Sequence, residues 1–153
     1  MSGGVRERAL VISSDAGLLL VTGCAHPGIV ELARKAGEVC SREIYAVMGG
    51  FHLGGASSGE VSSIIASLKA LEVQYAGPCH CTGKQALSAF REAFSNCFIT
   101  LGAGKRISSR TSSFDSQGWF VGIDCLLGLS AILYRYGLNA GFSVEYLHGR
   151  LFV

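Results

Sequence analysis

The chain has 153 residues, a length that suits one domain. Apolar residues make up 49% of it and charged residues 16%, a balance that excludes a disordered protein. The net charge is only +2 and the basic residues are scattered, so the sequence shows no electrostatic footprint for nucleic acid.

The first ten residues are polar and contain no apolar core of the kind that a signal peptide requires. We therefore expect a cytoplasmic protein in a reducing compartment, with its six cysteines as free thiols. Cys79 and Cys81 are separated by one residue, whereas the cysteines of zinc knuckles are separated by roughly two to four. That spacing argues against a zinc ribbon.

Two short apolar runs, residues 8–12 and 18–21, enclose the turn sequence SSDAG and predict a β-hairpin. A helix is expected over residues 28–39, where apolar side chains recur on one face at Ile29, Leu32, Ala36 and Val39. Residues 44–48 are apolar throughout, which is typical of a strand buried on both faces of a parallel sheet.

The clearest helix signal covers residues 58–71, where apolar residues follow the helical repeat at Val61, Ile64, Ile65, Leu68 and Leu71. Ser57 and Glu60 form a candidate capping box at its start. A strand is expected next, over residues 73–76.

Thr82 with Gln85 gives a second candidate capping box, opening a helix with Leu87, Phe90 and Phe94 on one side. Residues 97–101 are expected to form another strand, and residues 105–107 to extend the sheet. Strands that alternate with helices predict an α/β architecture with at least some parallel pairing.

The sequence predicts one domain over residues 6–108, followed by a linker and a C-terminal segment of unassigned role over residues 109–153. Residues 105–118 are polar and rich in serine, as linkers are. The apolar run 119–134 is shorter than the roughly 20 residues that span a bilayer, and Asp124 interrupts it. A buried or poorly ordered segment is therefore favoured over a membrane span.

Three histidines follow predicted strands, each in a loop that contains glycine: His26, His52 and His80. Open α/β sheets bind ligands at the carboxyl ends of their strands, and imidazole is a common ligand of zinc and iron. A single loop histidine is ordinarily a surface or capping residue, as we interpret His148, but three at equivalent positions favour a shared metal site. We predict that the imidazoles of His26 and His80 lie within about 8 Å, because neighbouring strands are about 4.8 Å apart.

The cysteines have two interpretations. Cys24, Cys79 and Cys81 lie beside the histidines and would serve either as metal ligands or as small residues that pack tight loops, and the second is favoured. The other three, Cys40, Cys97 and Cys125, have apolar neighbours and are interpreted as core thiols.

The segments LLLVTGCAHPGIV, IYAVMGGFHL, VQYAGPCHCTG and AFREAF, in this order, resemble the metallo-β-lactamase superfamily of metallohydrolases. The resemblance is strongest to the branch labelled dihydropterin ribofuranosyl-aminobenzene phosphate synthases. It implies the C-terminal half of a four-layer αββα sandwich, here with an appended C-terminal segment.

The resemblance also implies a site of one or two metal ions, either zinc or another divalent metal such as iron or manganese. His26 matches the first histidine that the second half of the fold supplies, and His80 matches the last. His52 stands where the bridging aspartate usually falls, so it is either a substitute ligand or a supporting group.

Two departures from the family pattern limit the activity that is expected. The sequence contains no HxHxDH motif, which the first half of the fold normally supplies, and no aspartate between Asp15 and Asp115. His26 and His80 alone fall short of the three protein ligands of a typical catalytic zinc site, and three are reached only with His52. We therefore expect a metal-binding domain of an incomplete hydrolase with unassigned catalytic residues, or alternatively a non-catalytic α/β interaction module.

Half a sandwich would leave one face of its sheet uncovered. An apolar patch of several hundred Å² on a protein surface usually marks a partner. The expected partner is the missing N-terminal half or a second copy of the chain, and the small-molecule substrate is not identified by the sequence.

Overall fold

The computed structural model describes residues 7–107, 121–123 and 131–133 of the chain. Its main sheet has four strands in the order β1-β2-β3-β4, with bounds β1 (Ala9–Ser14), β2 (Gly17–Thr22), β3 (Ile44–Gly49) and β4 (Tyr75–Pro78). β1 and β2 form the predicted antiparallel hairpin, and β2, β3 and β4 run parallel. The carboxyl ends of these three parallel strands therefore share one edge of the sheet.

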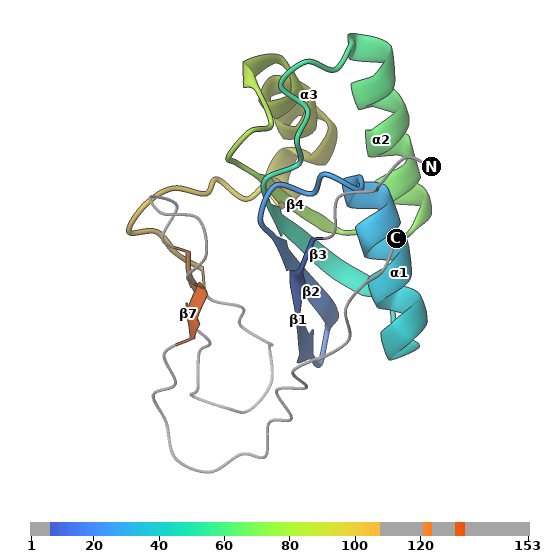
Figure 1. The fold of residues 1–153 in the computed structure, drawn as a ribbon, viewed down its shortest axis with the longest axis vertical. Helices are drawn as coiled ribbons and strands as arrows, with labels where there is room; N and C mark the ends of the chain where they lie inside the picture. The colour runs from blue at the N-terminus through green and yellow to red at the C-terminus, as the bar shows by residue number, and fades with distance from the viewer. Residues whose placement is uncertain (1–6, 108–120, 124–130, 134–153) are drawn as a thin grey trace.

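Helices occupy the connections between the parallel strands, as Figure 1 shows. Helix α1 (Ile29–Cys40) joins β2 to β3, α2 (Ser58–Ala70) joins β3 to β4, and α3 (Lys84–Phe94) follows β4. The apolar faces of all three helices join Leu20, Val47 and Ala76 of the strands in one buried core. This confirms the predicted α/β fold of a hairpin followed by three helices that alternate with strands.

The two predicted capping boxes have different outcomes. Ser57 caps α2 as expected: its hydroxyl accepts from the backbone N–H of Glu60, and the Glu60 carboxylate accepts from the backbone N–H of Ser57. The box predicted for Thr82 and Gln85 is wrong, because α3 begins at Lys84 after a glycine N-cap that provides no side-chain hydrogen bond. Thr82 is instead fully buried, and its hydroxyl accepts a hydrogen bond from the backbone N–H of Phe51.

The second face of the main sheet is also apolar, and its centre is buried. Strand register places Val21, Met48 and Gly77 in one row across this face, and Val21 and Met48 are both buried. Ile99 and Leu101 lie against it at Gly77. Val39 on α1 is the large apolar side chain that is exposed in the described part of the chain, and the expected uncovered face stays a prediction.

The chain after α3 differs from the prediction. Residues 97–101 do not form a strand: a short 3₁₀ helix (Ser95–Cys97) leads to a single bridge between Phe98 and Ala76. Residues 105–107 do not extend the main sheet, because β5 (Arg106–Ile107) pairs with β6 (Val121–Ile123), which pairs with β7 (Ala131–Leu133). These three form a separate antiparallel sheet.

The apolar run 119–134 thus contains two short strands where the structure describes it. Most of the predicted linker and of the C-terminal segment, including Asp124, Cys125 and His148, lies outside the described residues. Within the ranges that are described, no helix is long and apolar enough to cross a membrane.

Candidate metal centre

Three loops meet at the carboxyl edge of the main sheet, one after each parallel strand. Backbone hydrogen bonds join them: Gly50 N–H donates to the Gly23 carbonyl at 2.9 Å, and Cys79 N–H donates to the Gly49 carbonyl at 2.8 Å. Gly54 N–H donates to the Cys81 carbonyl at 3.1 Å. The loop after β3 is therefore bonded to both of its neighbours, and the three loops form one continuous surface.

Glycine makes this close approach sterically feasible. A Cβ atom on Gly50 would lie 2.4 Å from the Gly23 carbonyl oxygen and 2.9 Å from the Cys81 sulfur. Gly49 has a φ of 123°, and a Cβ there would lie 2.2 Å from the Thr22 carbonyl oxygen. Any larger residue would separate the loops, because side chains do not tolerate contacts this short.

Thr82 also joins two of the loops. Its hydroxyl accepts a hydrogen bond from the backbone N–H of Phe51 at 3.2 Å and donates to the carbonyl of His80 at 3.2 Å. The side chain is fully buried. It therefore fixes the loop that carries His80 relative to the loop that carries His52.

Each loop holds one non-glycine residue in the left-handed backbone region. These residues are Ala25 (φ 56°), His52 (φ 51°) and Cys81 (φ 52°). Such conformations are uncommon for side-chain-bearing residues and gather at functional sites. Each is itself a candidate ligand or is adjacent to one.

The first pair of candidate ligands is His26 with His52. Their ring centroids are 4.4 Å apart and the rings are tilted by 55°. Both side chains are solvent-accessible at the edge of the sheet, and the His26 side chain is 38% exposed. The loops after β2 and β3 thus bring two of the predicted ligands into contact.

Glu7 binds the loop that carries His26. Its carboxylate accepts hydrogen bonds from three successive backbone N–H groups, those of Cys24 (2.7 Å), Ala25 (2.8 Å) and His26 (2.6 Å). The same carboxylate lies 3.2 Å from Nδ1 of the His26 ring, and the Glu7 side chain is only 12% exposed.

These bonds determine the charge state of Glu7. Burial would raise the pKa of its carboxyl, but the hydrogen bonds from the backbone amides of His26, Ala25 and Cys24 outweigh burial and lower it. The group is therefore ionised at neutral pH and carries a negative charge next to the His26 ring. Sequence reasoning missed Glu7, because a single glutamate before a strand carries no pattern that distinguishes it.

The second group of candidate ligands consists of Cys24, His80 and Cys81. Their ligand atoms all lie within 4.8 Å of one another. The Cys81 thiol donates to the Cys24 carbonyl at 3.7 Å. The pKa of the Cys81 thiol is raised to about 11, chiefly by burial; the backbone N–H of His52 works against this rise and the Cys24 thiol adds to it.

The structure therefore divides the predicted ligands into two adjacent sets. His26 lies with His52, whereas His80 lies with two cysteines, and the group of three within 4.8 Å contains no second histidine. The predicted spacing of about 8 Å between the imidazoles of His26 and His80 stays a prediction. Cys79, the third cysteine considered, contributes its backbone N–H to the bond with Gly49 and is not in the group.

The donor atoms in these loops fit a divalent metal ion. Imidazole nitrogen and thiol sulfur are the ligands that zinc prefers, and imidazole also suits iron. A carboxylate on Nδ1 is the usual support of a histidine that binds metal through its other nitrogen, and Glu7 stands in that relation to His26.

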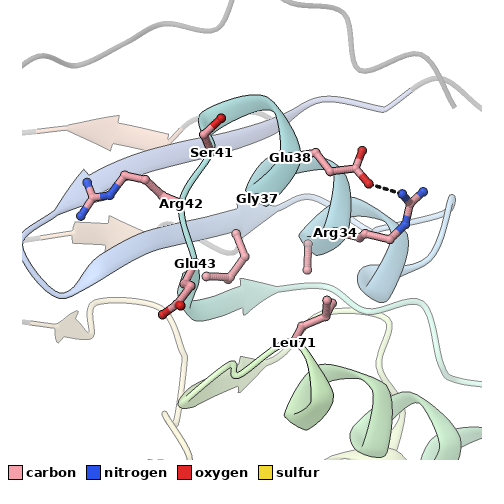
Figure 2. A pocket seen from close by; sticks show the side chains of 9 residues that line it. Arg34, Gly37, Glu38, Ser41, Arg42, Glu43 and Leu71 are labelled. Atoms are coloured by element: carbon pink, nitrogen blue, oxygen red, sulfur yellow. Dashed lines mark hydrogen bonds and ion pairs between the residues drawn. The ribbon is translucent and has the colours of Figure 1, made fainter.

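A hollow of about 400 Å³ lies elsewhere, at the opposite edge of the sheet. Figure 2 shows it between the end of α1 and the start of β3, with Leu71 on its far side and the ion pair of Arg34 with Glu38 at its rim. It is open, and its lining contains none of the candidate metal ligands.

Comparison with known proteins shows what the chain is similar to. No family model matches the chain. It is 42% identical over 102 residues to 7,8-dihydropterin-6-methyl-4-(beta-D-ribofuranosyl)-aminobenzene-5'-phosphate synthase of Methanocaldococcus jannaschii. The match covers 66% of this chain and 35% of that protein. It is 35% identical over 89 residues to an uncharacterized protein of the same organism, covering 58% of this chain and 33% of that protein.

Among solved structures, the chain resembles the crystal structure of Tm1679, a metal-dependent hydrolase of the beta-lactamase superfamily. The TM-score is 0.55 at 35% sequence identity, over 58% of this chain and 35% of the other. The relation to the metallo-β-lactamase superfamily that the motifs predicted is thereby confirmed. The chain spans about a third of the length of each of these relatives.

Proposed function

We propose that this chain is the metal-binding half of a metallo-β-lactamase-fold hydrolase, and that its three loops bind a divalent ion, with zinc as the first candidate. The observation that carries the proposal is the convergence of imidazoles and thiols from three separate loops at one edge of the sheet. The relation to a metal-dependent hydrolase supports it.

His26 and His80 are the proposed ligands, with His52 as the third. Glu7 would hold the Nδ1 side of the His26 ring and leave the other nitrogen for the ion. Thr82 and Gly50 would keep the loops of His52 and His80 at the separation that a shared site requires.

A metal ion held by His26, His52 and His80 would supply an activated water for attack on an ester, phosphoester or amide bond. The HxHxDH half of the fold, which normally completes the site, would have to come from a sequence other than these 153 residues. We propose that half, or a second copy of this chain, as the partner. We propose no substrate for this chain, because it spans 35% of the synthase's length.

Elemental analysis of the purified chain after exposure to zinc or iron tests the proposal. The unmodified chain should retain metal through gel filtration, and the double variant His26→Ala/His80→Ala should lose it with unchanged helix content by circular dichroism. Glu38→Gln, at the opposite edge of the sheet, is the control and should retain metal. If the unmodified chain binds no metal, the α/β interaction module becomes the better description.

A further inference from the structure

We infer that Cys24 and Cys81 are metal ligands together with His80, so that this chain alone provides a three-ligand site of two thiolates and one imidazole for zinc or another thiophilic divalent ion. The inference rests on the proposed metal-binding function. It deepens that function by naming a ligand set that the histidine pattern does not contain.

The geometry of the three groups matches the ion. Bond lengths of about 2.3 Å to sulfur and 2.0–2.1 Å to nitrogen place tetrahedral zinc ligands roughly 3.3–3.8 Å from one another. The ligand atoms of Cys24, His80 and Cys81 lie within 4.8 Å of one another. Binding therefore requires a contraction of about 1 Å, which side-chain rotation supplies without a change in the loops.

The backbone holds both cysteines in place independently of their thiols. The N–H of Cys24 is bound by the Glu7 carboxylate, and the carbonyl of Cys81 accepts from Gly54 N–H. Cys81 has a left-handed backbone, and the missing side chain of Gly50 leaves the space that its sulfur occupies. A binding site requires such support, because ligands must be positioned before the ion arrives.

The alternative for these cysteines was simple packing. Cys40 and Cys97 show what packing cysteines look like here, since both lie against the apolar core. Cys24 and Cys81 are outside that core and close to an exposed imidazole. Their surroundings are those of ligands.

Three protein ligands with one open position are typical of a catalytic zinc site, and two cysteines with one histidine are one of the known combinations. The shortfall that the sequence showed for His26 and His80 alone therefore disappears. Each thiol would release its proton to solvent as its sulfur binds the ion, so two protons leave for each ion bound. Thiolate ligands favour zinc over manganese, which prefers oxygen.

Cobalt(II) titration of the metal-free, reduced full-length chain tests the inference, because cobalt bound to thiolate absorbs in the near ultraviolet through charge transfer and cobalt bound to imidazole alone does not. We expect this band in the unmodified chain and its loss or weakening in Cys24→Ser and Cys81→Ser. Zinc affinity should fall by at least about 100-fold in each variant. Cys40→Ser, on α1, is the matched control and should keep the full band and affinity.

The outcomes separate this inference from the proposed function. Cobalt or zinc bound without a charge-transfer band, and lost in His26→Ala/His80→Ala, would overturn the thiolate site and leave the metal-binding function intact. Absence of any metal binding would overturn both. If a serine variant fails to fold, absence of the band from the unmodified chain still overturns the inference.

Discussion

Replacing Gly50 with alanine tests whether close contact between the loops holds the candidate site together. The Cβ atom of the new residue would lie 2.4 Å from the Gly23 carbonyl oxygen, and 2.9 Å from both the Cys81 sulfur and the His80 carbonyl oxygen. The backbone of Gly50 is not left-handed, so the effect of Gly50→Ala would be steric.

The size of the effect follows from what the new methyl group meets. Overpacking a closely packed region costs about 1–3 kcal/mol. Two of the three contacts are to backbone oxygens, which cannot rotate away, so we expect a loss of about 3 kcal/mol in the free energy of unfolding. For a domain of this size, that loss lowers Tm by roughly 12–24 °C.

Thermal unfolding followed by circular dichroism measures this loss. Gly55→Ala is the control, since a Cβ there meets nothing within 4 Å and the residue lies in the same connection between β3 and α2. It should change stability by no more than about 0.5 kcal/mol. Equal Tm values for the two variants would show that the loops separate freely and that the argument from close contact is wrong.

Three further predictions concern single side chains of the site. Glu7→Gln should lower the free energy of unfolding by about 2 kcal/mol at pH 7 in urea titrations, because three amides lose a charged acceptor. Since the folded pKa of Glu7 is lowered, this difference is full above its ordinary value of 4.5 and should shrink as pH falls through the folded pKa; a difference that persists in acid would contradict it. Thr82→Val should lower the free energy of unfolding by about 2 kcal/mol in the same assay, because it leaves the Phe51 N–H and the His80 carbonyl unpaired. Thr82→Ser should keep most of that free energy, and equal stabilities of the two variants would refute the role of the hydroxyl. Alkylation of Cys81 in the metal-free chain, followed by mass spectrometry, should accelerate up to about pH 11, and a rate already constant at pH 9 would contradict the raised pKa.

The elements of the main domain could be predicted because each has a local signal. The apolar repeat from Val61 to Leu71 and the capping box of Ser57 determine α2 within a few residues. Alternation of strands with helices then implies parallel pairing, which puts the loops after β2, β3 and β4 on one edge. The meeting of these loops follows from topology alone.

Two errors had a common cause, because a local pattern was outweighed by a distant contact. Thr82 has the spacing of a helix cap, but its hydroxyl accepts from the Phe51 N–H of another loop. Residues 97–101 have the composition of a strand, yet they pack on the second face of the sheet over Gly77, with one bridge to Ala76. A local sequence pattern does not indicate such a long-range contact.

The grouping of the candidate ligands at this edge of the sheet could not be predicted from the sequence. Sequence places His26, His52 and His80 at equivalent positions, which suggests one set of three. The structure brings the rings of the first two together and puts the third beside two cysteines, and the backbones of His52 and Cys81 are both left-handed. Residue type signals a left-handed backbone only weakly, so topology predicts the edge and not the partners.

The supports of the site all lie within the described part of this chain. Glu7 binds three amides of the first loop, Gly50 admits the contact between the first and second, and Thr82 joins the second to the third. A site whose supports and ligands are local should bind its ion without the other half of the fold. Hydrolysis also requires a substrate surface, which the HxHxDH half would supply. Metal binding and catalysis should therefore separate in this chain, and measured metal binding without hydrolysis would be the expected behaviour of half a metallo-β-lactamase site.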